Sequence, residues 1–330
     1  MLKDSFNRVI NYLRISLVDR CNLRCVYCMP LENIRFLPGE ELLTSREIEL
    51  VVQAAVSVGF HKFRLTGGEP TLRSDLIDIV ERITKIPGVD DLALTTNGLL
   101  LRTLAEPLKR AGLKRINVHL DSLNPEVVRR QMRWGSFERI WEGIAAAEAV
   151  GLTPLKLNAV VVRGYNDREV SDLARLTLDH AWHVRFIESM PLGPGKCASV
   201  AAQGYVSNRD TRELIERELG TMYELQSEDV SDESRNFRLN GAAGVVGFIS
   251  PVSDPYCGSC NRMRLTADGK FHMCLLNDDE LDVRKLLRRG DSTLSEIGQV
   301  LIRAVANKPF GHRLAEGHST QGRSMFQIGG

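Results

Sequence analysis

The sequence predicts an α/β protein in which six strand–helix units form a parallel β-sheet and a smaller domain follows. Short runs of β-branched and apolar residues alternate with amphipathic helical runs from residue 12 to about residue 188. Each unit spans about 25 to 40 residues, enough for a helical crossover between parallel strands. This fits an incomplete β/α barrel of the TIM type or an open doubly wound sheet. Because the alternation ends near Pro191, we expect domains over 1–190 and 191–330.

The strands are predicted where short apolar runs alternate with polar residues. In chain order they are Tyr12–Leu17, Lys62–Thr66, Leu92–Thr96, Arg115–Leu120, Leu155–Val162 and His183–Glu188. The clearest helical patterns between them are Ser45–Val58, Ser74–Ile83 and Phe137–Val150. In the second domain we expect a loop over 191–210, a short helix at Thr211–Glu218 and several β-type runs.

Most predicted strands have one apolar and one polar face, because side chains alternate along a strand. If the apolar faces meet the helices, the interior of a barrel is polar and basic. The residues on that face are Arg14, Lys62, Arg64, Thr66, Thr95, Asn117, His119, Lys156, Asn158 and Arg185. Burying unpaired cations costs several kcal/mol each, so such an interior requires water or an anionic ligand. In an open sheet the same residues would form a solvated face.

The overall charge argues against nucleic acid or membrane partners. The chain has 43 basic and 42 acidic residues, a net charge of +1. Its N-terminus lacks the apolar core of a signal peptide, and no stretch reaches the roughly 18 apolar residues of a membrane span. We therefore expect a soluble, cytoplasmic protein.

Six of the seven cysteines form two groups near opposite ends of the chain, which indicates metal binding rather than a disulfide framework. The first group, Cys21, Cys25 and Cys28, directly follows the first strand. A four-iron cluster normally takes four thiolates, so three leave one iron open to another ligand. Zinc is the alternative, but the spacing C-x3-C-x2-C does not match the paired C-x2-C of most zinc modules. Cys197 stands alone and is expected to be a free loop thiol.

The second group is Cys257, Cys260 and Cys274. With His272 as a fourth ligand, its spacing suits zinc about as well as a cluster. Arg262 and Arg264 follow at once on one face of a strand, which a structural zinc site does not need.

Two motifs together resemble the radical S-adenosylmethionine superfamily: the first cysteine group with Tyr27 before its last cysteine, and Thr66–Pro70 at the end of the second strand. The resemblance implies a [4Fe-4S] cluster whose open iron is chelated by S-adenosylmethionine. One electron then cleaves this cofactor to methionine and a 5′-deoxyadenosyl radical. The positions implied for its binding are Tyr27, Gly68, His119 and Met190. His119 stands where the family usually has a serine, so a structural role for it is equally open.

Within the superfamily, the chain resembles the GTP 3′,8-cyclase branch over nearly its full length. The matching stretches include Leu13–Ser16, Asp19–Asn22, Arg64–Pro70, Thr95–Gly98, Arg115–Val118, Arg185–Glu188, Cys257–Leu265 and Gly329-Gly330. The resemblance implies an incomplete (βα)6 barrel whose open side is covered by the C-terminal domain. It also implies a second [4Fe-4S] cluster, at Cys257, Cys260 and Cys274, that accepts the guanine of GTP.

The resemblance implies GTP contacts at Arg14, Arg64, Thr95, Lys156, Arg262, Met263 and Arg264, and adds Lys62 and Arg185. Most of these cations are those that strand alternation places in the interior. Gly329 and Gly330 are implied to enter the active-site pocket, the alternative being a frayed terminus.

The implied enzyme is a lyase that catalyses the first step of molybdenum cofactor biosynthesis. The deoxyadenosyl radical abstracts hydrogen from the ribose C3′ of GTP, C3′ bonds to C8, and reduction gives 3′,8-cyclo-7,8-dihydro-GTP. No acid or base residue is evident. Flavodoxin or ferredoxin would supply electrons, and cyclic pyranopterin monophosphate synthase would take the product.

Two other functions stay open on the sequence, as does the oligomeric state, for which a homodimer is one possibility. A radical enzyme of another branch, such as a peptide maturase, would share the N-terminal motifs. A non-enzymatic electron carrier would need neither Thr66–Pro70 nor a basic interior.

Overall fold

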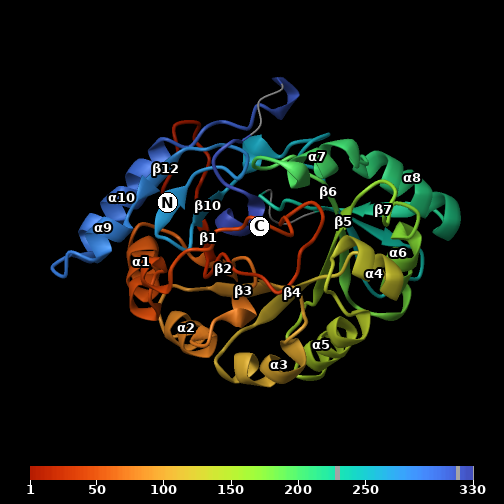
Figure 1. Cartoon of the computed structure of the whole chain (residues 1–330), viewed down its shortest axis with the longest axis horizontal. Helices are drawn as coiled ribbons and strands as arrows, with labels where there is room; N and C mark the ends of the chain where they lie inside the picture. The colour runs from red at the N-terminus through yellow and green to blue at the C-terminus, as the bar shows by residue number, and fades with distance from the viewer. Residues whose placement is uncertain (227–230, 317–319, 330) are drawn as a thin grey trace.

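The computed structural model describes residues 1–226, 231–316 and 320–329, which form one twelve-stranded sheet in the order β12-β11-β10-β1-β2-β3-β4-β5-β6-β9-β8-β7. Six parallel strands in chain order make its centre, as predicted, and curve into an incomplete barrel (Figure 1). They are β1 (Tyr12–Ser16), β2 (Lys62–Thr66), β3 (Asp91–Thr96), β4 (Arg115–His119), β5 (Lys156–Val161) and β6 (His183–Glu188). Each lies within two residues of its predicted bounds.

Helices cover the outside of this barrel (Figure 1). They are α1 (Ser45–Ser57), α2 (Leu76–Thr84), α3 (Leu101–Arg110), α4 (Pro125–Gln131), α5 (Phe137–Ala149) and α6 (Val170–Asp179). Local signals fix their ends. For example, α1 begins after Thr44, whose hydroxyl accepts from the Glu47 N–H while the Glu47 carboxylate accepts from the Thr44 N–H.

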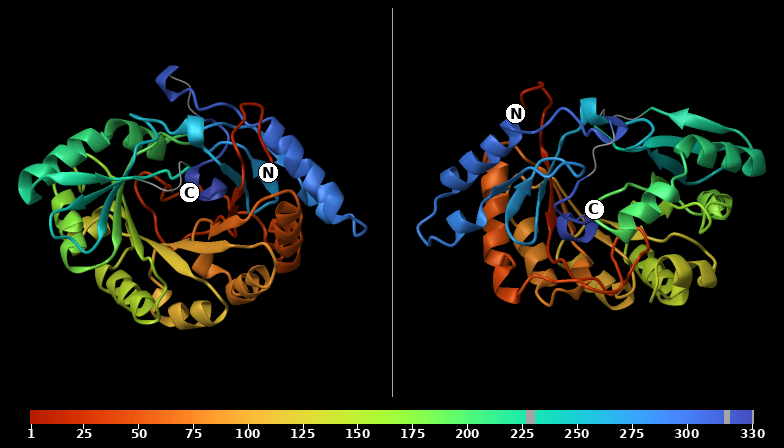
Figure 2. Two further views of the ribbon diagram at one scale, coloured as in Figure 1. Left: turned by 180° about the vertical axis from the view of Figure 1, so that it is seen from behind. Right: turned by 45° about the horizontal axis from the view of Figure 1, so that its top comes forward.

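The C-terminal region extends both edges of the same sheet. On one side β10 (Arg262–Leu265) pairs parallel with β1, followed by β11 (Lys270–His272) and β12 (Glu280–Asp282). On the other, β9 (Val245–Ile249) pairs parallel with β6, followed by β8 (Arg235–Leu239) and β7 (Met222–Leu225). The region thus lies across the open side of the barrel (Figure 2).

The remaining helices are α7 (Lys196–Gln203), α8 (Asn208–Leu219), α9 (Arg284–Leu287), α10 (Leu294–Ala306) and α11 (Met325–Ile328). The prediction of a loop over 191–210 is wrong, because α7 and the start of α8 lie within it. Gly193 and Gly195 made this stretch read as a loop, yet Gly195 only precedes the first turn of α7. Helix α10 packs against α1, and α11 lies inside the ring of strands (Figures 1 and 2).

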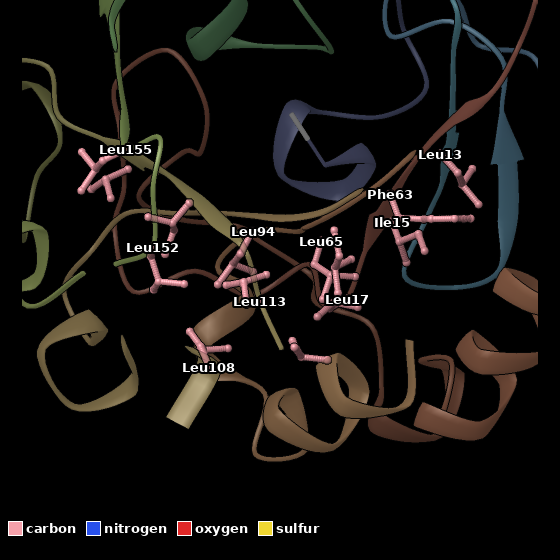
Figure 3. Close-up of a cluster of buried hydrophobic side chains, with 14 of the residues drawn as sticks. Leu13, Ile15, Leu17, Phe63, Leu65, Leu94, Leu108, Leu113, Leu152 and Leu155 are labelled. Carbon is pink, nitrogen blue, oxygen red and sulfur yellow. The ribbon is translucent and has the colours of Figure 1, made fainter. Parts of the chain in front are cut away.

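The main core lies between the barrel strands and the surrounding helices. Figure 3 shows Leu13, Ile15, Phe63 and Leu65 in this layer, and each is fully buried. Burying such a side chain contributes about 1.5–3 kcal/mol. The predicted apolar faces of β1 and β2 are therefore confirmed, and the polar residues between these apolar ones face the interior. None of the helices in the described ranges is long and apolar enough to cross a bilayer.

Candidate active site

Three arginines form a row across neighbouring strands on the inner face of the barrel. Arg14 of β1 is in register with Arg64 of β2 on one side and with Arg264 of β10 on the other. All three are less than 10% exposed. Burial and the neighbouring cations lower the pKa of Arg64 and that of Arg264 to about 10. The interior is therefore as basic as the strand faces predicted.

A carboxylate that the sequence did not reveal stands among these arginines. Glu233, just before β8, accepts from Arg14 Nη2 at 2.8 Å and from Arg262 Nη1. Its Oε1 lies 3.6 Å from Arg64 Nη1 and 3.8 Å from Arg185 Nη1. Burial alone would raise the pKa of Glu233, but the four guanidinium groups hold it well below its ordinary value.

The first cysteine group lines a cavity of about 230 Å³ at the carboxyl ends of the strands. Cys21, Cys25 and Cys28 form part of its wall, and no fourth cysteine joins them among the described lining residues. Burial raises the pKa of Cys21 to about 11 and raises that of Cys25, so these thiols become ligands only when a metal's charge displaces their protons. Three thiols on one wall fit a four-iron cluster with one open iron.

The turn after β2 is held by a buried carboxylate. Glu69 accepts from the hydroxyls of Thr71 at 2.5 Å and Thr96 at 2.6 Å, and from the Asn97 N–H at 2.7 Å, so it ties the ends of β2 and β3 together. A Cβ on Gly68 would lie 2.4 Å from the Arg20 carbonyl oxygen. Only glycine allows this close approach, and it leaves Gly68 on the cavity wall.

His119 belongs to a polar triad at the same cavity, with the half-buried Tyr27 and the buried Asp121. The Tyr27 hydroxyl lies 2.5 Å from His119 Nε2 and donates to Asp121 Oδ2 at 2.8 Å. His119 Nε2 is 3.1 Å from the same carboxylate oxygen. Burial lowers the pKa of His119, but Asp121 outweighs this and raises it. The structure thus brings Tyr27, Gly68, His119 and Met190 to one cavity.

The second cysteine group lines a smaller cavity next to the first. Cys257, Cys260 and Cys274 share its wall with Arg262 and Arg264, and Met190 lines both cavities. Burial would raise the pKa of Cys260, but Arg262 and the buried Lys308 lower it to about 6. Lys308, which the sequence reading missed, also donates to the Met273 carbonyl oxygen at 2.7 Å. A thiolate at neutral pH is a ready ligand for iron.

The wall of this smaller cavity does not include His272, whose Nδ1 instead lies 3.4 Å from a Glu280 carboxylate oxygen. In the described ranges, no three His, Cys, Asp or Glu side chains form a site for a single metal ion. A four-iron cluster distributes its ligands over several irons, so it does not need such convergence.

The other residues predicted to contact GTP lie in three places. Thr95 lines the first cavity, whereas Lys62, Lys156 and Arg185 line a second, basic cavity that shares Arg64 and Glu233 with the first. The prediction for Met263 is wrong for its side chain. Met263 lies between Arg262 and Arg264 on β10, so alternation turns its side chain into the hydrophobic core, where it is fully buried.

The C-terminal tail enters the barrel. Met325 and Phe326 of α11 line the first cavity. Gly329 has a positive φ of 86°, and a Cβ there would lie 2.8 Å from Thr66 Cγ2. Gly330, predicted to share its role, lies outside the described residues.

Cys197 is not the loop thiol that the sequence predicted. It lies in the first turn of α7 and is 8% exposed. It is close enough to Cys28 to contribute to the raised pKa of that thiol, although burial is the larger cause.

Glu188 at the end of β6 anchors the segment that leads to the second cysteine group. Its carboxylate accepts from the N–H groups of Val252 at 3.0 Å and Ser253 at 2.9 Å, and from the N–H of Asn208 at 3.0 Å. The sequence placed Glu188 at the end of a strand and in the family-matched stretch Arg185–Glu188, without a role. Its partners lie far along the chain, so no local pattern identified this role.

Comparison with known proteins gives two adjoining family matches. Residues 15–177 match the radical SAM superfamily, and residues 182–314 match the family described as Molybdenum Cofactor Synthesis C. The chain is 47% identical over 329 residues to a protein of Pelotomaculum thermopropionicum named GTP 3′,8-cyclase, with 100% of each chain covered. It is 44% identical over 332 residues to the protein of that name from Moorella thermoacetica, again with 100% of each covered.

Solved structures share the fold at low sequence identity. The crystal structure of Streptococcus suis SuiB bound to S-adenosylmethionine has a TM-score of 0.62 and 16% identity, and the match covers 87% of this chain and 67% of that one. A structure titled native anSMEcpe with bound AdoMet has a TM-score of 0.56 at 16% identity, covering 86% and 81%.

Proposed function

The chain belongs to the GTP 3′,8-cyclase family of radical S-adenosylmethionine enzymes, and on that premise we propose how its own residues carry out the family reaction. It is an enzyme that converts GTP to 3′,8-cyclo-7,8-dihydro-GTP, the first step of molybdenum cofactor biosynthesis. Its cofactors are S-adenosylmethionine and iron–sulfur clusters. The observation that carries the residue assignment is the shared interior: one cavity joins Cys21, Cys25 and Cys28 to Arg14, Arg64 and Arg264.

Cys21, Cys25 and Cys28 would hold the first [4Fe-4S] cluster, and Cys257, Cys260 and Cys274 the second. When bound, the first cluster and S-adenosylmethionine supply the 5′-deoxyadenosyl radical that takes hydrogen from the ribose C3′ of GTP. Because Gly68 packs closely against the Arg20 backbone, the turn after β2 is fixed at the cavity wall, where its backbone would meet the cofactor's amino acid portion. Met190 lines both cysteine cavities, which supports a position between cofactor and substrate.

The arginine row would bind the triphosphate. Planar guanidinium groups suit phosphate oxygens, and buried cations gain most from an anionic ligand. Arg264 belongs to the row, Arg262 shares Glu233 with Arg14, and both line the cavity of the second cysteine group. They would therefore align the phosphates with a guanine placed at that group. The chain's part in catalysis is to fix C3′ near the radical source and to exclude water.

The test is anaerobic reconstitution with iron and sulfide, followed by assay with S-adenosylmethionine and either GTP or a peptide. We expect GTP to stimulate 5′-deoxyadenosine formation and to give the cyclic product. Stimulation by a peptide alone would assign the chain to another branch, and no cleavage of S-adenosylmethionine would indicate an electron carrier.

We infer two partners from the chemistry alone. Reductive cleavage of S-adenosylmethionine needs a low-potential donor, for which flavodoxin or ferredoxin is suited. The product would pass to cyclic pyranopterin monophosphate synthase. Pull-down of each from a lysate that also contains the reconstituted enzyme would test both interactions.

A further inference from the structure

Glu233 stands at the junction of two interior cavities. With Arg64 it lines both the cavity that holds the first cysteine group and the basic cavity lined by Lys62, Lys156 and Arg185. Only 9% of Glu233 is exposed. Among the proposed GTP-binding cations, Arg14 and Arg264 line only the first of these cavities. Lys62, Lys156 and Arg185 line only the basic one, and Glu233 lies between the two sets.

The backbone around Glu233 is built to bring it there. Asp232 accepts from the Ser234 N–H at 3.2 Å and from Asn236 Nδ2 at 3.1 Å, which holds a turn before β8. On neighbouring β9, a Cβ at Gly247 would lie 2.3 Å from Ser234 Oγ. The missing side chain of Gly247 lets this segment approach the interior.

One carboxylate does not balance the cations that face it. Arg14, Arg64, Arg185 and Arg262 all lie within ion-pair distance of Glu233. Arg264 has no ion pair among the described residues, nor has Lys156. Asp232, which also lines the basic cavity, acts on Lys156 and Arg185 but does not balance this surplus of positive charge. A ligand with more negative charge than a carboxylate would satisfy these groups better.

The same guanidinium groups cannot face both this carboxylate and a triphosphate, because two anions in contact repel each other. We propose that Glu233 is an internal counter-anion that occupies the phosphate position in the nucleotide-free enzyme and is displaced by the triphosphate of GTP. It then acts as a specificity-determining residue, because a ligand with fewer phosphates displaces it less readily. This proposal rests on the proposed function, in which these cations bind GTP.

The test is calorimetric titration of the anaerobic, cluster-loaded enzyme with GTP, inorganic triphosphate and guanosine. We expect Glu233→Gln to bind GTP and inorganic triphosphate about tenfold more tightly than the parent, the scale of one charge-assisted contact, with guanosine binding unchanged. The matched control is Glu224→Gln on β7, whose carboxylate is exposed and paired with Arg235, and it should bind every ligand like the parent.

Thermal unfolding gives a second readout. Without nucleotide, Glu233→Gln should melt lower than the parent, because four arginines lose their counter-anion. With GTP its melting temperature should rise more than that of the parent. If Glu233→Gln does not fold, Glu233→Asp, which keeps the charge on a shorter side chain, should bind GTP more tightly than the parent does.

Unchanged binding of GTP and triphosphate in both variants would overturn the proposal. Weaker GTP binding would also overturn it, because Glu233 would then contact the nucleotide itself. Arg264→Ala separates this failure from that of the proposed function. If Arg264→Ala weakens GTP binding while Glu233→Gln leaves it unchanged, only the counter-anion fails, whereas normal GTP binding in both places the nucleotide elsewhere.

Discussion

Arg14 and Arg264 are registered partners in the parallel strand pair β1 and β10, so two buried guanidinium groups lie side by side from opposite ends of the chain. Arg14 has Glu233 as a partner, whereas Arg264 has no ion pair in the described part of the chain. Burial and the charge of Arg14 both oppose the protonated form of Arg264 and lower its pKa to about 10. Arg264 therefore gains an ion-pair partner only when an anion binds.

The first prediction follows from this difference between neighbouring arginines. Arg264→Ala should lower kcat/KM for GTP about ten- to a hundredfold, the loss of one charge-assisted contact worth roughly 1.5–3 kcal/mol. Without GTP this variant should melt no lower than the parent, because an unpaired buried cation is removed. Arg262→Ala should melt lower, because it takes a partner from Glu233. Scanning calorimetry and product assay measure both effects.

Arg209→Ala on α8 is the control, since Arg209 forms only an exposed pair with Glu213. It should match the parent in turnover and nearly so in melting temperature. Equal GTP affinity in parent, Arg264→Ala and Arg262→Ala would mean that these cations do not meet the substrate.

The sequence revealed the composition of this interior but not its arrangement. Alternation along β1 and β2 predicted that Arg14 and Arg64 face inward, because that argument is local. That Arg264 lies beside Arg14 depends on pairing between strands at opposite ends of the chain, which no local pattern specifies. Glu233 lies in a turn before β8, where neither periodicity nor a motif marks a side chain as buried.

The second prediction concerns metal content. The reconstituted protein should bind about eight irons in two four-iron clusters, with little zinc. Replacing Cys257, Cys260 and Cys274 together by Ala should halve the iron and leave the visible absorbance of the first cluster. Elemental analysis and absorbance spectra check this. Stoichiometric zinc in anaerobically purified protein would contradict the assignment of the second site.

The third prediction is that Cys197 is not a cluster ligand, although it lies near Cys28 in a helix rather than in a loop. The variant Cys197→Ala should keep the full iron content and turnover. Its melting temperature should fall slightly, because a small buried side chain leaves a gap. Loss of one cluster's iron in this variant would make Cys197 a fourth ligand.

The fourth prediction is a pH dependence of GTP binding. Burial and the neighbouring cations Arg185 and Arg115 lower the pKa of Lys156 to about 7. If a triphosphate binds nearby, it raises that pKa, so binding takes up a proton and affinity falls as the pH rises above about 7. Calorimetry in two buffers of different ionisation enthalpy measures the protons taken up. Lys156→Met should take up fewer protons than the parent, and equal uptake would contradict the prediction.

The low pKa of Lys156 has the opposite effect on folding stability, which should increase as the pH rises, whereas GTP affinity should fall. The pKa of Lys156 in the folded protein lies below the roughly 10.4 of an unfolded lysine. Between these two values the unfolded chain binds more protons, so the free energy of unfolding should rise with pH across that window. The rise should be smaller in Lys156→Met.

The last prediction concerns the C-terminal tail, where the resemblance to the family and the packing agree. Gly329 has a positive φ of 86°, and a Cβ there would lie 2.8 Å from Thr66 Cγ2 and 3.0 Å from Ser16 Cβ, at the edge of the proposed cofactor site. Deleting Gly329 and Gly330 should abolish cyclisation and spare both clusters, and Gly329→Ala should lower turnover at least about tenfold through this clash.

Gly290→Ala is the matched control for the tail. Gly290 has a similar φ of 84°, but nothing lies within 4 Å of a Cβ placed there. This variant therefore carries the same backbone strain without a clash, and its turnover should equal that of the parent. Product assay and iron analysis on the three variants test whether the tail acts in the active site. A tail that only frays at the surface would tolerate both the deletion and Gly329→Ala. Full turnover in those two variants would remove the tail from the active site.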